Sequence, residues 1–337
     1  MKAAIRDRYG STDVVRIEEV ERPVPEGDQV LVRVNAASVN RADLDALGPR
    51  PAFARLFMGV RRPRRHGLGL DVAGVVEEVG PAVTRFRPGD RVFADLYTFS
   101  IGTFAEFACA PERAFQAIPV GLSFLDAATL PHAGTLAMQG LRMRNGRTIK
   151  PGDRVLIDGA SGSVGPFAVQ IAKSMGAEVT GVTSTAKLDL VESLGADHVI
   201  DYTTTAYTKT GERYDWIIAA DSHHPIRSVR RALRPNGVYL TLGGNSASIV
   251  GSLILGPLAS LGSDRYSGLM LWWKPFDPDD MARLTQLIAD GKVRPVIERT
   301  YSLDEAVDAL RHVEAGRARG KVVITMQDGT PEASPKP

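Results

Sequence analysis

The sequence predicts an α/β protein with two domains, one rich in β-strands and one built on a doubly wound parallel sheet. Its 337 residues suffice for two domains of roughly 150 residues each. Residues 1–125 are rich in valine, with glycine and proline every few residues, which is typical of short strands between turns. From residue 154 onward, strand-like segments alternate with helical ones, which indicates a parallel sheet with helices on both faces.

The β-rich part is expected to hold short strands, followed by one helical stretch at 123–142. These strands are predicted within residues 29–40, 71–80, 90–94 and 102–111. The alternating part is expected to have strands at 154–158, 178–184, 198–201, 215–220 and 237–244. Its helices are predicted at 163–175, 187–195 and 226–233. The chain then continues with helices at 279–290 and 304–314, a strand at 320–326 and an expected disordered tail from about residue 327.

The composition excludes several functions. Lys plus Arg (41) nearly cancels Asp plus Glu (39), so the overall charge gives no case for binding nucleic acid. Cys109 is the only cysteine, which excludes an intramolecular disulfide and a zinc site made of cysteines. The first ten residues contain no apolar signal core, and no apolar run approaches the ~20 residues that span a membrane. We therefore expect a cytoplasmic protein that does not insert into a membrane.

A glycine-punctuated turn joins the predicted strand 154–158 to the helix that follows it. Gly159, Gly162 and Gly165 form GxxGxxG, which allows a tight turn, a close approach to a pyrophosphate and close packing of helix on strand. The start of the helix offers free N–H groups to phosphates. We therefore predict a dinucleotide site, to which Ser161, Ser163 and Val164 also belong; the alternative is a tight turn without a ligand.

The end of the second strand of this domain predicts which dinucleotide is bound. An NAD site usually has Asp or Glu there to bind the ribose hydroxyls. This chain has Thr183, Ser184, Thr185 and Lys187 and no acid. Hydroxyls and an ammonium group attract a 2′-phosphate. We therefore predict NADP(H) rather than NAD(H), although Lys187 alone could be a solvated surface charge.

Several longer motifs resemble the medium-chain dehydrogenase/reductase superfamily, and within it the zinc-independent quinone oxidoreductase branch. They lie in order along nearly the whole chain, at residues 38–44, 69–94, 102–108, 151–165, 194–202 and 320–324. The resemblance implies a GroES-like catalytic domain from residues 1–125 and 292–337, and a Rossmann NADP-binding domain at 126–291 with the active site in the cleft. It also implies a homodimer that pairs the last Rossmann strand, residues 267–273.

The resemblance also shows where this chain departs from the zinc-dependent branch. The positions of the zinc ligands hold Asn40, Leu70 followed by Asp71, and Pro131. Asn, Leu and Pro are not usual zinc ligands. We therefore expect no metal, and we expect His66 and His132 to be packing or hydrogen-bonding residues.

Four residues are candidates for catalysis. Asn40 takes the place of a zinc-ligating cysteine, and its amide could donate to the substrate oxygen, hold the nicotinamide ribose or bond its own backbone. Asp43 could lie near the site or bond backbone N–H groups. Thr135 matches a family threonine beside the nicotinamide and phosphates, with a capping or core role as the alternative. Tyr97 could donate a proton or simply pack.

The remaining cofactor candidates come from the ends of predicted strands and from the C-terminal part. Tyr202 is expected to flank the adenine, and Gly243 and Gly244 end the sixth strand of the Rossmann domain near the nicotinamide. Leu269 belongs to the predicted dimer strand. In similar proteins a basic residue near the C-terminus reaches the phosphates, which here could be Arg317, Arg319 or Lys321; we select Lys321.

These features predict an NADPH-dependent reductase of quinones or activated C=C bonds acting on a small apolar substrate. A conjugated substrate can spread the negative charge that follows hydride addition, so a few hydrogen-bond donors suffice without a metal. One alternative is an NADP-dependent alcohol dehydrogenase or carbonyl reductase. Another is an NADPH-binding sensor or scaffold with little catalysis.

Two segments remain open. The basic run at 61–66 could attract an anionic ligand or partner, but a solvated loop is the preferred interpretation. The apolar segment 246–273 could line the substrate pocket, form the dimer interface or touch a membrane surface.

Overall fold

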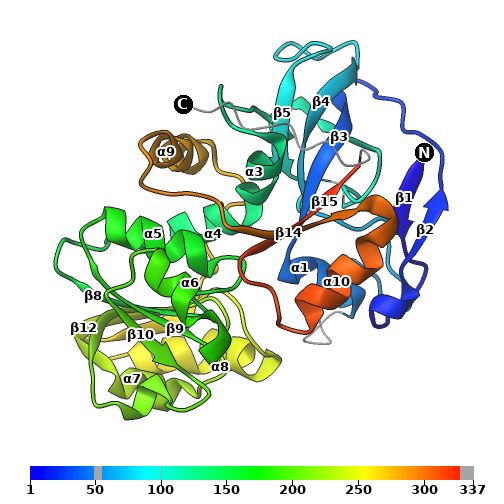
Figure 1. Cartoon of the computed structure of the whole chain (residues 1–337). Helices are drawn as coiled ribbons and strands as arrows, with labels where there is room; N and C mark the ends of the chain where they lie inside the picture. Colours follow the sequence, from blue (N-terminus) through cyan, green and yellow to red (C-terminus); the bar gives the residue numbers. More distant parts are fainter. Residues whose placement is uncertain (49–54, 100, 327–337) are drawn as a thin grey trace. The chain divides into compact units, whose positions relative to one another are not determined.

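A computed structural model describes residues 1–48, 55–99 and 101–326 of the chain (Figure 1). The predicted disordered tail therefore lies outside the described residues. The chain divides into two compact units. Unit 1 comprises Met1–Ala133, Pro275–Met281 and Ile297–Pro337, and unit 2 comprises Gly134–Lys274 and Ala282–Val296.

Unit 1 is built on a sheet that has seven strands within the described residues. Its central strand β3 (Gln29–Val39) pairs antiparallel with β4 (Asp71–Val79), β6 (Phe107–Pro111) and β15 (Lys321–Thr325). The sheet is completed by β5 (Arg91–Asp95), β7 (Gln116–Ala117) and β14 (Ile297–Ser302). A separate hairpin consists of β1 (Lys2–Ile5) and β2 (Arg16–Glu19). The expected β-rich domain is confirmed, and its last strand comes from the far end of the chain.

The strand register of unit 1 brings distant polar residues together. β15 pairs with β3 so that Val322 lies opposite Val39, which places Lys321 beside Asn40. Asn40 follows β3 directly and is the N-cap of α1 (Arg41–Leu47), whose first turn contains Asp43. Other helices of the unit are α2 (Arg55–Met58), α3 (Phe124–Thr129) and α10 (Ala306–Glu314).

Unit 2 contains a parallel sheet with six strands among the described residues, in the order β10-β9-β8-β11-β12-β13. The strands are β8 (Arg154–Asp158), β9 (Glu178–Thr183), β10 (His198–Asp201), β11 (Tyr214–Ala219), β12 (Leu233–Thr241) and β13 (Tyr266–Leu269). The helices that connect them include α5 (Gly165–Ser174), α6 (Leu188–Ser193), α7 (Ile226–Arg231) and α8 (Ser246–Ser260). The strand order reverses at β8, so the predicted doubly wound sheet is confirmed.

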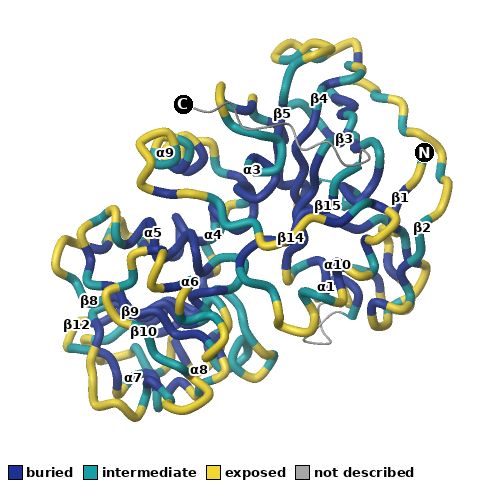
Figure 2. The backbone as a smooth tube through the Cα atoms, in the orientation of Figure 1, coloured by how far each residue is buried: buried dark blue, intermediate teal, exposed yellow. Residues whose placement is uncertain are grey.

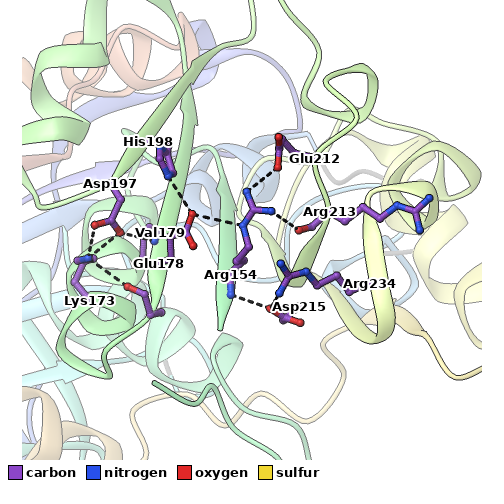
Figure 3. A network of polar contacts seen from close by, with 11 residues as sticks. Arg154, Lys173, Glu178, Val179, Asp197, His198, Glu212, Arg213, Asp215 and Arg234 are labelled. Carbon is purple, nitrogen blue, oxygen red and sulfur yellow. Dashed lines mark hydrogen bonds and ion pairs between the residues drawn. The ribbon is translucent and has the colours of Figure 1, made fainter. Parts of the chain in front are cut away.

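The central strands of both large sheets are buried, whereas the edge strand β14 and most connecting segments carry exposed residues (Figure 2). At the amino ends of β8, β9 and β10, charged side chains tie the strands of unit 2 together (Figure 3). Arg154 Nη2 lies 2.8 Å from Glu212 Oε2, Lys173 Nζ lies 2.7 Å from Asp197 Oδ2, and His198 Nε2 lies 3.0 Å from Glu178 Oε1. This network lies at the amino ends of the strands. The glycine turn lies at their carboxyl ends, which is where sheets of this kind bind ligands.

The helical stretch predicted at 123–142 consists of two helices, α3 and α4 (Pro131–Gly140), with a bend at Leu130 between them. Two other expectations about elements were wrong. Gly243 and Gly244 follow β12, which is the fifth strand of its sheet along the chain and not the sixth. The final strand β13 ends at Leu269, four residues earlier than expected. Within the described residues, none of the helices has the length and apolar character needed to cross a bilayer.

Candidate active site

The glycine turn of unit 2 has no room for side chains at two of its three glycines. Gly159 has φ +83°, and a Cβ there would lie 3.1 Å from the Cβ of Asp221. A Cβ on Gly165 would lie 2.2 Å from the carbonyl oxygen of Gly159. Gly162 is more open, with a single neighbour at 3.5 Å. The turn therefore keeps its backbone close to the start of α5, where a phosphate could approach it.

Unused polar groups at the turn fit a dinucleotide. Helix α5 has Val164 at its N-cap and no side-chain cap among the described residues, so its first N–H groups remain available. The Oγ of Ser163 is buried and has no hydrogen-bond partner among the described residues. Thr135, on α4, is fully buried, and its Oγ1 likewise has no hydrogen-bond partner among the described residues. Buried hydroxyls rarely stay unpaired, so these two are candidates for ligand contacts.

Two hydroxyl residues at the end of β9, Thr183 and Thr185, were predicted to bind the cofactor but form hydrogen bonds within the protein. Thr183 is buried and its hydroxyl lies 2.5 Å from that of Ser161, so these two hydroxyls bind each other. Thr185 Oγ1 donates to Asp201 Oδ2 at 2.5 Å, because the parallel register places Asp201 opposite Thr183. An acid therefore does stand beside this strand end. It was missed because it comes from the neighbouring strand, β10.

The charge of Asp201 bears on the cofactor. Hydrogen bonds from Thr185 and Thr203 lower the pKa of Asp201, so it is ionised near neutral pH. Ser184 and Lys187, which were also predicted to attract a 2′-phosphate, are half-buried. The exposed Tyr202 follows Asp201 directly, at the carboxyl end of β10.

The other predicted cofactor residues of unit 2 lie at the carboxyl ends of its last two strands. Gly243 and Gly244 follow β12, and a Cβ on Gly244 (φ +137°) would lie 2.3 Å from the carbonyl oxygen of Ser222. Leu269 ends β13, opposite Thr241. Their contacts with a cofactor remain a prediction.

Unit 1 holds a buried polar cluster around Asp71. Lys321 Nζ donates to Asn40 Oδ1 at 2.7 Å and lies 3.5 Å from Asp71 Oδ2. Asn40 Nδ2 donates to the same carboxylate oxygen at 2.9 Å, and Ser38 Oγ donates to it at 2.6 Å. The backbone N–H of His132 donates to Asp71 Oδ1 at 2.9 Å. The side chains of Lys321, Asn40 and Asp71 are at most 1% exposed.

These contacts assign Lys321 a place that was not expected. Burial lowers the pKa of Lys321 and raises that of Asp71, while their mutual attraction favours the charged forms. The ammonium group is used by Asn40 and Asp71, so its predicted contact with cofactor phosphates stays untested. Asn40 does not point freely into solvent, since both ends of its amide take part in the cluster.

Three further titratable groups adjoin the cluster. Asp43 Oδ2 accepts the backbone N–H of Asn40 at 2.7 Å, which is the backbone-bonding role considered for it. Burial raises the pKa of Asp43 to about 7, and its Oδ1 has no partner among the described residues. His132 Nδ1 lies 2.9 Å from Asp95 Oδ2. Burial alone would lower the pKa of His132, but the charges of Asp95 and Asp71 raise it.

Tyr97 is the accessible catalytic candidate. Its residue is 45% exposed, its ring centroid lies 6.2 Å from that of His132, and its backbone N–H donates to Asp95 Oδ1 at 2.8 Å. Burial and then the charge of Asp95 raise the pKa of Tyr97, so its hydroxyl is protonated at neutral pH. The structure brings Asn40, Asp43 and Tyr97 into one region of unit 1.

The residues of this cluster do not fit a zinc ion. Lys321 and Asn40 bring N–H donors to Asp71, whereas zinc needs lone-pair donors of sulfur, imidazole or carboxylate. Among the described residues, no group of three or more His, Cys, Asp or Glu side chains is placed to hold a metal ion. His66 and His132 make hydrogen bonds, as expected: His66 Nδ1 lies 3.0 Å from the carbonyl oxygen of Arg6.

The chain resembles known dehydrogenases over almost its whole length. The family model for an alcohol dehydrogenase GroES-like domain matches residues 26–120, and that for a zinc-binding dehydrogenase matches residues 194–324. The human "NAD(P)H oxidoreductase RTN4IP1, mitochondrial" is 32% identical over 97% of this chain and 89% of its own length. The tomato (Solanum lycopersicum) "2-methylene-furan-3-one reductase" is 32% identical over 96% of this chain and 79% of its own length. The quinone oxidoreductase structure from Coxiella burnetii covers 97% of this chain and 99% of its own, with 30% identity and a TM-score of 0.85.

The GroES-like unit with its buried polar cluster, together with the Rossmann-like sheet and its glycine turn, defines a two-domain dehydrogenase. The chain belongs to the medium-chain dehydrogenase/reductase superfamily, in its quinone oxidoreductase-like branch. The resemblance inferred from the sequence motifs is therefore confirmed.

Proposed function

We propose that this protein uses NADPH to reduce quinones or α,β-unsaturated carbonyl compounds by hydride transfer, without a catalytic metal. That the chain is an NAD(P)H oxidoreductase of the quinone oxidoreductase and enone reductase type follows from its relatives. The observation that carries the proposal of a metal-free reaction is the hydrogen bond from Lys321 to Asn40, because Asn40 occupies the position that the resemblance assigns to a zinc ligand in zinc-dependent members. A site built from such residues suits a conjugated substrate, which can delocalise the charge that hydride addition creates.

The residues of unit 2 fit the cofactor. The backbone at Gly162 and the free N–H groups at the start of α5 would bind the pyrophosphate, with Ser163 Oγ as an additional donor. Ser184 and Lys187 would bind the 2′-phosphate, and Tyr202 would pack on the adenine. Asp201 opposes this preference, because its carboxylate repels a 2′-phosphate; the attraction by Lys187 and Ser184 is proposed to outweigh it.

When bound, NADPH would supply a hydride to the β-carbon of an enone or to the quinone ring, and the substrate would then carry the negative charge as an enolate or hydroquinone anion. Tyr97 is proposed to donate the hydrogen bond and then the proton that completes the reduction, since its hydroxyl is protonated and accessible. Water would return the proton to Tyr97.

The other catalytic candidates have supporting roles in this proposal. Asn40 is held by Lys321 and Asp71, so it can present one fixed amide edge. Asp43 fixes the backbone at Asn40. Thr135, with its unpaired hydroxyl, is proposed to contact the cofactor.

We also propose that the protein is a homodimer. β13 is an edge strand of its sheet, and α8 beside it exposes Ile254, Leu255 and Leu258. The outer edge of β13 is used in part, because Ser260 Oγ accepts the backbone N–H of Ser267 at 2.9 Å and donates to its carbonyl oxygen at 3.3 Å. An edge strand next to exposed apolar side chains is suited to pairing with a second copy. Light scattering that gives twice the mass of one chain would support this. A cytoplasmic location also stays a prediction, and the human relative and the chloroplastic quinone oxidoreductases are named for organelles.

A steady-state assay tests the proposed activity. Oxidation of NADPH is followed at 340 nm with a panel of quinones and enones, and in parallel with saturated aldehydes and ketones with and without added zinc. Turnover of the conjugated compounds alone supports the proposal. Zinc-dependent turnover of saturated carbonyl compounds would favour an alcohol dehydrogenase, and NADPH binding without any turnover would favour a sensor.

A further inference from the structure

Unit 1 contains a cavity with a strongly basic lining. Its volume is about 310 Å³, which lies at the lower end of small-molecule sites. The described residues that line it are Arg6, Met58, Arg64, Arg65, Tyr97 and Ile101. Half of them are arginines and none is acidic. The basic run at 61–66, which the proposed function leaves unexplained, thus contributes two side chains to a cavity.

Arg6 is the unusual member of this lining. It is 1% exposed, and its Nε and Nη1 atoms are buried without a hydrogen-bond partner among the described residues. Burial lowers the pKa of Arg6, but a guanidinium group remains charged at neutral pH. A buried guanidinium with two unused N–H directions is rare, because its desolvation is normally offset by acceptors.

Nearby carboxylates do not supply those acceptors. The charge of Asp43 attracts Arg6, yet no ion pair within 4 Å joins them in the described structure, and Asp43 Oδ2 accepts the backbone N–H of Asn40. The neighbouring Asp7 instead binds Arg16 and lies 3.0 Å from His66 Nδ1. The charge of Asp43 therefore attracts the Arg6 guanidinium, but none of the described carboxylates forms an ion pair with it.

The local fold holds the arginines against one cavity. The backbone N–H of Arg6 donates to the carbonyl oxygen of His66 at 2.9 Å, and His66 Nδ1 lies 3.0 Å from the carbonyl oxygen of Arg6. These contacts fasten the end of the basic run to the residue after β1. Of the three arginines in the lining, Arg64 and Arg65 are exposed and Arg6 is buried.

Tyr97 connects this cavity to the polar cluster. Its side chain is part of the lining, and its ring lies 6.2 Å from that of His132, whose backbone N–H is bonded to Asp71. A molecule in the cavity would therefore contact the residue that the proposed function uses as proton donor.

We propose that the preferred substrate carries a carboxylate group, which Arg6 binds inside this cavity. This rests on the proposed function and narrows its substrates to small anionic enones or quinones. The carboxylate accepts hydrogen bonds from the unused N–H groups of Arg6, and Arg64 and Arg65 attract it to the mouth. In this proposal the expected apolar quinone or enone carries, in addition to its conjugated ring or chain, an anionic group at one end.

A matched substrate pair tests the proposal. The full-length protein is assayed with NADPH and either 3-benzoylacrylate or its methyl ester, which differ in the anionic group. The wild type is expected to have the lower KM for the acid. In Arg6→Met, the ratio of kcat/KM for acid over ester should fall by about 10- to 100-fold, the usual effect of losing a hydrogen bond to a charged group. Arg62→Met, an exposed residue of the same basic run outside the lining, is the control and should leave the ratio within about twofold.

A second measurement does not depend on turnover. Calorimetric binding of the saturated acid, 4-oxo-4-phenylbutanoate, should be about 10- to 100-fold weaker in Arg6→Met, and Arg6→Lys should lie between that variant and the wild type. Equal KM values for acid and ester in the wild type, or an unchanged ratio in Arg6→Met, would overturn the proposal. Tighter binding of inorganic phosphate than of the acid would overturn the assignment to a carboxylate. If neutral quinones are reduced but the acid is not preferred, only this inference fails; if no conjugated compound is reduced while the saturated acid binds, the proposed function fails instead.

Discussion

The ammonium group of Lys321 donates a hydrogen bond to the side-chain oxygen of Asn40 across 2.7 Å, although 281 residues separate them in the chain. Antiparallel pairing of β15 with β3 produces this contact, and Asp71 on β4 completes it. A cation is thus built into the GroES-like unit by its own strands. In the proposed function it fixes Asn40 and compensates a buried carboxylate.

Replacing Lys321 by Met is expected to destabilise the protein. The change leaves Asp71 buried without its cation, which typically costs about 3–5 kcal/mol of unfolding free energy. In the double variant Lys321→Met/Asp71→Asn, the loss should be clearly smaller than the sum of the two single losses. Urea denaturation followed by circular dichroism gives these values, and strictly additive losses would show that the two side chains do not interact.

Replacing Tyr97 by Phe should lower kcat for quinones and enones by about 100-fold, because the proposed proton donor is removed. The apparent KM should change by only a few fold. The thermal midpoint serves as control and should remain the same, since Tyr97 is 45% exposed. A kcat equal to that of the wild type would assign Tyr97 a packing role.

The cofactor preference should depend on two residues of opposite charge. Lys187→Ala is expected to weaken NADPH binding by about tenfold, the loss of one charge-assisted contact, and to leave NADH nearly unchanged. Asp201→Asn should strengthen NADPH binding, because an ionised carboxylate is removed from beside Thr185. Fluorescence titration measures both. An equal loss for both cofactors in Lys187→Ala would make that residue structural.

Asp158, the last residue of β8, should make stability depend on pH. Burial raises its pKa to about 7, so the folded protein keeps a proton that the unfolded chain releases near pH 4. Its contribution to stability is complete below about pH 4 and is lost as the pH rises to about 7. At pH 8, Asp158→Asn should therefore be more stable than the wild type by about 1–4 kcal/mol.

The stability of Asp158→Asn should also decline less steeply between pH 4 and 7. A residual decline is expected from Asp43, whose pKa is also raised to about 7 by burial. Urea denaturation at several pH values tests this. Identical pH profiles for the variant and the wild type would contradict the assignment of a buried, protonated Asp158.

Much of the fold could be predicted because its signals are local. The alternation of strands and helices after residue 154, and the spacing of Gly159, Gly162 and Gly165, predicted the parallel sheet and the glycine turn. Helix α8 was missed because its sequence is apolar without a clear polar face and contains Pro257. Its start could have been found, since Asn245 is a good N-cap and its side chain accepts the backbone N–H of Ser248 at 2.8 Å.

The site was less predictable because its contacts are non-local. Lys321 was placed at the cofactor phosphates, and only strand pairing shows that it meets Asn40. Asp201 escaped notice because it enters from the strand beside Thr183, not from the end of the same strand. Arg6 does not belong to any sequence motif that would have marked it. Its burial beside the basic run at 61–66 depends on the pairing of Ile5 with Gly67.

The transfer of a hydride to a conjugated carbon is the central claim, and isotope transfer measures it most directly. NADPH carrying deuterium on the transferred C4 position is incubated with an enone and the purified protein, and the product is analysed by mass spectrometry and NMR. The account predicts one deuterium at the β-carbon of the reduced product. A product without deuterium, deuterium on a carbinol carbon, or no product with any quinone or enone would contradict it.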